Sequence, residues 1–99
     1  MTPKTTLQEC RTTLSPDEVL RQATEYFSQR SSLYATFPDR VGAGFRTFRG
    51  QGGEEIVIAA MPEQGATLVT GSTYLFDMQV ARFLAGLPPA AAANAGAGG

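Results

Sequence analysis

The sequence predicts an α+β domain in which a three-stranded antiparallel sheet has two helices packed on one face, in the order α-β-β-β-α. Two stretches, at 15–30 and 77–87, carry apolar residues at the i, i+3, i+4 spacing of an amphipathic helix. Between them, runs rich in β-branched and aromatic residues are separated by short turns containing glycine and proline, which is the pattern of antiparallel hairpins. We therefore expect one domain at 15–89, with an extended N-terminal arm at 1–14 and an Ala/Gly-rich C-terminal tail at 90–99.

The N-terminal stretch is rich in threonine and has only Leu7 and Leu14 as apolar anchors, so an arm rather than a core element is expected there. The first helix begins just beyond it. Ser15 stands at the N-cap, Pro16 at the first helical position, and Glu18 where it can bond back to the cap. We expect this helix to end near residue 29 or 30.

Three strands are expected at 41–49, 54–61 and 66–76, joined by turns at 50–53 and 62–65 that contain glycines able to adopt positive φ angles. Gly71, inside the third run, is interpreted as a bend or bulge that lets a long strand curve over a helix. The segment 31–40 contains Leu33, Tyr34 and Phe37 and is too apolar for a free loop. It is expected to tuck against an edge of the core as an irregular turn or short helix.

The second helix is expected to have Asp77 as its cap and to stop at Pro88. Its apolar side chains form an i, i+3, i+4, i+7 stripe made of Val80, Phe83, Leu84 and Leu87. The tail that follows contains only alanine, asparagine and glycine, none of which can anchor it to a core.

Composition narrows the possible functions. Eight basic and nine acidic residues give a net charge of −1, so no broad electrostatic field would attract nucleic acid, and nucleic-acid binding is not expected. The chain has no run of 18 apolar residues for a membrane-spanning helix and no apolar stretch of a secretory signal. A cytoplasmic location, including one peripheral to a membrane complex, is the prediction.

The residues that usually carry catalysis are scarce. Histidine is absent, which removes the commonest general base and metal ligand, and the single Cys10 cannot form an internal disulfide. Glu54 and Glu55 would point to opposite faces of a strand, so they cannot act as a paired acid and base. Ser72 follows a glycine but has no histidine base. We predict no enzyme, and no catalytic, cofactor-binding or metal-binding residues.

The two faces of the predicted sheet follow from pairing Arg49 with Glu54 and Met61 with Ala66. One face then collects a continuous apolar set, assigned to the core: Phe45, Ile56, Ile58, Ala60, Val69 and Leu75. The other, left open, collects a mixed set: Arg46, Phe48, Val57, Ala59, Leu68, Thr70 and Tyr74. Two alternatives remain at this point, since a register slip of one residue swaps the faces and residues 33–37 could fold over the open one.

The order of elements over 41–87, with the last strand bent at a glycine and leading into a C-terminal helix, resembles a trimmed part of the helix-grip ligand-binding fold. That resemblance implies a small molecule bound between sheet and helices. Such a pocket would be lined by Phe27, Phe45, Ile58 and Phe83. A small-molecule-binding domain is therefore the alternative function.

The leading prediction is a non-catalytic accessory subunit or adaptor that binds other protein chains, in a hetero-complex or a homo-oligomer, within a larger assembly that is soluble or membrane-associated. An apolar patch on an open sheet face is seldom exposed by a soluble monomer without use. The predicted contacts are the open sheet face and the termini, with edge strands as a second route. The partner-binding residues are Arg46, Phe48, Val57, Leu68, Thr70 and Tyr74.

Overall fold

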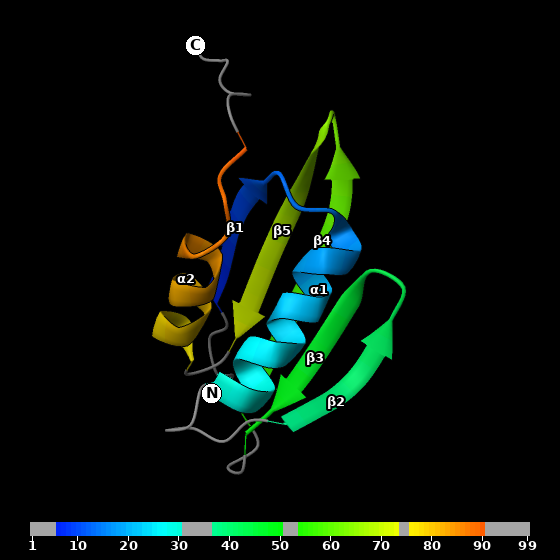
Figure 1. Cartoon of the computed structure of the whole chain (residues 1–99). Coiled ribbons are helices and arrows are strands. Elements are labelled where there is room, and N and C mark those ends of the chain that lie inside the picture. The colour runs from blue at the N-terminus through cyan, green and yellow to red at the C-terminus, as the bar shows by residue number, and fades with distance from the viewer. Residues whose placement is uncertain (1–5, 31–36, 51–53, 74–75, 91–99) are drawn as a thin grey trace.

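The computed structural model describes residues 6–30, 37–50, 54–73 and 76–90. Within these ranges the chain forms five strands and two α-helices, the first of which continues into a π-helical turn (Figure 1). In chain order they are β1 (Thr6–Thr12), α1 (Pro16–Glu25), the π-helical turn η1 (Tyr26–Arg30), β2 (Phe37–Gly42), β3 (Phe45–Arg49), β4 (Glu55–Glu63), β5 (Ala66–Thr73) and α2 (Asp77–Ala85).

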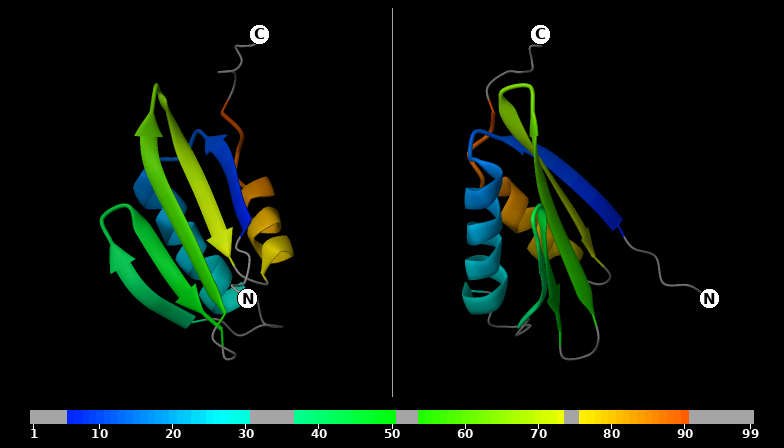
Figure 2. Two further views of the ribbon diagram at one scale, coloured as in Figure 1. Left: turned by 180° about the vertical axis from the view of Figure 1, so that it is seen from behind. Right: turned by 90° about the vertical axis from the view of Figure 1, so that its right-hand side faces the viewer.

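The strands form a single antiparallel sheet in the order β1-β5-β4-β3-β2. The first strand of the chain thus lies beside the last one, as Figure 1 shows for β1 and β5. Both helices lie on the same face of the sheet (Figure 2), where α1 packs on β4 and β3 while α2 packs on β5 and β1. No described helix covers the opposite face, which we call the open face.

The predicted α+β class and the two helices on one face are confirmed, but the prediction of three strands is wrong. β1 forms in the stretch expected to be an arm. β2 begins inside the segment expected to be irregular, and the run expected to be one strand at 41–49 is split by a tight turn at Ala43 and Gly44. Both additional strands lie at sheet edges, where backbone pairing with one neighbour stabilises a strand whose own hydrophobic pattern is weak.

The start of α1 follows its sequence signals. The Ser15 hydroxyl accepts a hydrogen bond from the Glu18 backbone N–H at 3.2 Å, and Pro16 occupies the first helical position. The start of α2 differs from its sequence prediction, in which Asp77 was the cap. Phe76 is the N-cap residue, without a side-chain cap bond, and Asp77 is the first residue of the helix.

The core lies between the two helices and the covered face of the sheet. Phe27 is at its centre, with ring centroids 5.3 Å from Phe48 and 5.4 Å from Phe83. The other fully enclosed apolar side chains come from both helices and the central strands: Val19, Leu20, Ala23, Ile56, Ile58, Val69 and Val80. Burial of this apolar surface is the main term that stabilises the domain.

The end of β1 is joined to the chain that leaves α2. The Thr12 hydroxyl donates to the Pro88 carbonyl at 2.6 Å, and the Ala90 backbone N–H donates to the Arg11 carbonyl at 3.1 Å. Thr12 is fully buried, so this hydrogen bond satisfies a hydroxyl that has lost contact with water. The first strand and the last described residues therefore belong to the same packed unit.

Some predicted features lie outside the described residues: the turn at 50–53, most of the segment 31–40, Leu75 and the tail beyond Ala90. Among the helices that the structure describes, none has the length and apolar character required to cross a membrane.

Candidate protein-binding surface

Side-chain alternation on β4 and β5 separates the covered face from the open face. Ile56, Ile58 and Ala60 are buried under the helices, so the residues between them point the other way. The register places Ala59 opposite Thr70 and Met61 opposite Leu68. Alternation therefore assigns Val57, Ala59, Met61, Leu68 and Thr70 to the open face.

The register of β3 determines which of its aromatic residues joins them. Phe45 is opposite Ala59 and so lies on the open face, whereas Phe48 is opposite Ile56 and is buried in the core. Arg49 pairs with Glu55, one residue away from the Glu54 pairing that the sequence predicted. Because the side-chain period of a strand is two, this slip of one residue reverses both faces of β3.

The predicted contact residues divide accordingly. Val57, Leu68 and Thr70 lie on the open face, as predicted. The placement of Arg46 and Phe48 there is wrong, because both lie on the covered face: Phe48 packs on Phe27, and Arg46 donates to the Gly42 carbonyl at 2.7 Å. Tyr74 lies outside the described residues. The β4–β5 register also differs from the predicted one, but by two residues, which leaves the faces unchanged.

The sequence prediction missed three exposed apolar residues of the open face. Leu7 is 69% exposed, Met61 55% and Phe45 37%. Leu7 was missed because β1 was not recognised as a strand, although alternation in 6–12 is visible once pairing with β5 is known. Phe45 was missed through the slip in register, and Met61 because it stands at the predicted end of a strand that continues to Glu63.

Together these side chains form what we call the open-face patch: Leu7, Phe45, Val57, Ala59, Met61, Leu68 and Thr70. A hollow of about 270 Å³ lies within it, lined mainly by apolar atoms of Gly44, Ala59, Ala60, Met61, Leu68 and Thr70. The hollow exists because two of these positions, Gly44 and Ala59, have little or no side chain, while the neighbouring Phe45 ring lies against Gly42 on β2.

Ion pairs stand at both ends of the open-face patch. At the hairpin end the Arg11 guanidinium is 2.6 Å from the Glu63 carboxylate, and this hydrogen bond, followed by the charge of Glu63, raises the pKa of Arg11. At the other end Arg49 lies 3.3 Å from Asp39 and 3.8 Å from Glu55. Exposed pairs of this kind contribute about 0–1 kcal/mol to stability, so their significance is the pattern of charge they present.

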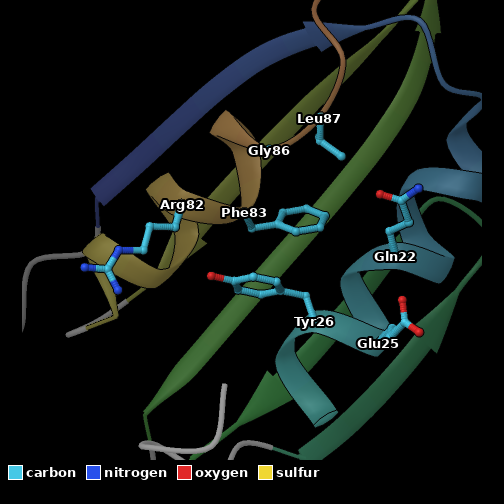
Figure 3. A pocket seen from close by; sticks show the side chains of 7 residues that line it. All are labelled: Gln22, Glu25, Tyr26, Arg82, Phe83, Gly86 and Leu87. Carbon is cyan, nitrogen blue, oxygen red and sulfur yellow. The ribbon is translucent and has the colours of Figure 1, made fainter. Parts of the chain in front are cut away.

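A second concavity lies between α1 and α2 (Figure 3). Its volume is about 150 Å³, and the rings of Tyr26 and Phe83, 5.6 Å apart, lie beside each other within it. Sites that enclose a drug-sized molecule usually have about 300–1,000 Å³. The pocket implied by the helix-grip resemblance does not form as predicted, because Phe27 and Phe83 are in ring contact and Phe45 lies on the opposite face of the sheet from Ile58.

Ser72 and Cys10, two side chains with nucleophilic groups, lie on opposite faces of the sheet. Ser72 lies on the open face opposite Leu7 and Val57. Over the described ranges, no three acidic or cysteine side chains cluster as a metal ion requires. Cys10 faces the core, where burial raises the pKa of its thiol and so lowers its nucleophilicity at neutral pH.

Comparison of the chain with models of known protein families, with curated proteins and with solved structures found no match.

Proposed function

We propose that this chain is a non-catalytic interaction module, an accessory subunit or adaptor, that binds an apolar surface of a protein through the open-face patch. The observation that carries the proposal is the exposure of Met61, 55%, at the rim of an apolar hollow, and of Leu7, 69%, on the same sheet face, which no described helix covers. Exposed apolar side chains gathered on one face are typical of protein-binding sites.

The sheet edges are less suited to binding a partner strand. β2 has an irregular register between Pro38 and Arg40, and its exposed residues there include a proline and two charged side chains. These are the features by which edge strands avoid pairing with other chains. The β1 edge is occupied at one end by the backbone bond between Ala90 and Arg11. Docking by face is therefore favoured over strand addition.

Site-specific photo-crosslinking in the cells that make the protein tests the proposal. A photoreactive amino acid replaces Met61 in one variant and Met78 in a matched control. Both methionines are exposed, at 55% and 65%, but Met78 lies on α2 rather than on the open face. We expect a discrete protein adduct from position 61 and none from position 78.

Two results would contradict the proposal. One is the absence of any protein adduct at position 61, and the other is equal adduct formation at both positions, which would show that apolar exposure alone and not the open face directs the contact.

A further inference from the structure

We infer that the protein which covers the open-face patch is a second copy of this chain, related by a twofold axis lying in the plane between the two sheets. This inference rests on the proposed function and names its partner. In such a dimer the same surface is used by both copies, so the surface must be complementary to itself.

Shape supplies the first part of that self-complementarity. The open-face patch contains both protruding apolar side chains, Leu7 and Met61, and a hollow of about 270 Å³ floored by the small residues Ala59 and Gly44. A protruding side chain of one copy can fill the hollow of the other, and the twofold axis repeats the contact in reverse. Met61 is suited to this role because its unbranched, flexible side chain adapts to an irregular cavity.

Charge supplies the second part. Each end of the open-face patch carries both signs, Arg11 with Glu63 at one end and Arg49 with Glu55 at the other. Glu9, opposite Thr70 on the same face, adds a negative charge beside Leu7 and Arg11. If the axis runs along the strands, each end of the patch meets the same end of the other copy, and if it runs across them, each end meets the opposite one. In both cases the facing end offers a positive and a negative partner. A face of one sign would repel its own copy, whereas this face carries both signs and the chain's net charge is only −1.

The alternative sites of self-association are weaker. Val41, 70% exposed, stands on β2, but the irregular register and the charges of that edge oppose pairing of two β2 strands. Met78 on α2 is exposed but lines neither the open-face hollow nor the concavity between α1 and α2. On the open face, protruding apolar groups and an apolar hollow occur together.

Sedimentation equilibrium of the purified full chain tests the inference. The chain has a mass of 10.5 kDa, and we expect the apparent mass to rise toward about 21 kDa, twice that value, as its concentration increases over roughly 1–500 μM. Met61→Lys should weaken the dimer at least tenfold, because the lysine charge would be buried against apolar surface. The matched variant Met78→Lys should leave the dissociation constant unchanged.

Circular dichroism is used to check whether Met61→Lys is folded. If it is not, Leu7→Lys replaces it with Val41→Lys as the matched control, since both side chains are about equally exposed and only Leu7 belongs to the open-face patch. A chain that stays monomeric throughout, or a dimer weakened equally by the patch variant and its control, overturns the inference.

The outcomes also separate this inference from the proposed function. A monomeric chain that still forms an adduct with a different protein at position 61 overturns the dimer and leaves the interaction module intact. A monomeric chain without any adduct overturns both.

Discussion

At Gly71 the absence of a side chain sets how closely α2 approaches the sheet. A Cβ placed there would lie 2.6 Å from Val80 Cγ1 and 3.3 Å from Ile58 Cδ1, and both of these side chains are fully buried. Gly71 was predicted to be a bend or a bulge, and a bulge is not formed, because the pairing of β4 with β5 continues through it without a shift. Glycine is required here for close packing of helix on strand.

We expect Gly71→Ala to lower the free energy of unfolding by about 1–3 kcal/mol, the usual cost of overpacking a core. Urea denaturation followed by circular dichroism measures it. Combining it with Val80→Ala should cost less than the sum of the two single changes, because removal of the valine methyl groups makes room for the new one. Gly86→Ala is the control, since its added Cβ meets only ordinary contacts at 3.5 Å or more. Additive effects of the first pair would disprove the close-packing explanation.

Helix α1 shows how one element is stabilised by charges near its first turn. The Glu18 carboxylate accepts hydrogen bonds from Arg21 and, at 3.0 Å, from Gln22. These two bonds lower the pKa of Glu18 from its ordinary value of 4.5 to about 2, and the bond from Arg21 has the larger effect. Because the folded pKa lies below the unfolded one, this contribution is present above about pH 4.5 and is lost as the pH falls toward 2.

The ¹³C carboxyl shift of Glu18, followed by NMR as the pH is lowered, should therefore titrate near pH 2. In Arg21→Gln the midpoint should move up toward 4.5, since the main hydrogen-bond donor is gone. Arg82→Gln, which removes an arginine from α2, serves as the control and should leave the midpoint in place. An unchanged midpoint in Arg21→Gln would show that the pair does not persist in solution.

For the whole molecule, β1 is the element that connects the first described residues of the chain to those that follow α2. Its inward side chains Cys10 and Thr12 pack on the core, and its backbone pairs with β5 over seven residues. The same strand presents Leu7, Glu9 and Arg11 to the open face. Stability and the proposed binding surface thus depend on one stretch that has no marked hydrophobic pattern.

The domain bounds of 15–89 expected from the sequence can be tested directly. We expect a chain of residues 15–89 to lose its cooperative unfolding transition. In that chain β5 would lose its pairing with β1, and the Pro88 carbonyl would lose the hydrogen bond from the Thr12 hydroxyl. Thermal and urea melts monitored by circular dichroism decide the outcome. A chain of residues 1–90 should unfold like the full-length protein. If the 15–89 chain unfolds as cooperatively as the 1–90 chain, β1 is an accessory arm after all.

Local signals in the sequence were sufficient for the elements that depend on neighbouring residues. The cap at Ser15 and Pro16 predicted the start of α1, and alternation in β4 and β5 placed Val57, Leu68 and Thr70 on one face. These features follow from backbone geometry within a few residues, which the sequence determines directly.

Only the tertiary structure decided which strand lies beside which, and in what register. Alternation shows that Phe45 and Phe48 point to opposite faces, but a slip of one residue against β4 exchanges them. The same holds for β1, whose pattern becomes readable only beside β5, more than fifty residues away. Long-range pairing is determined by the packing of the whole sheet under α1 and α2, and that is why the open-face patch could be predicted only in part.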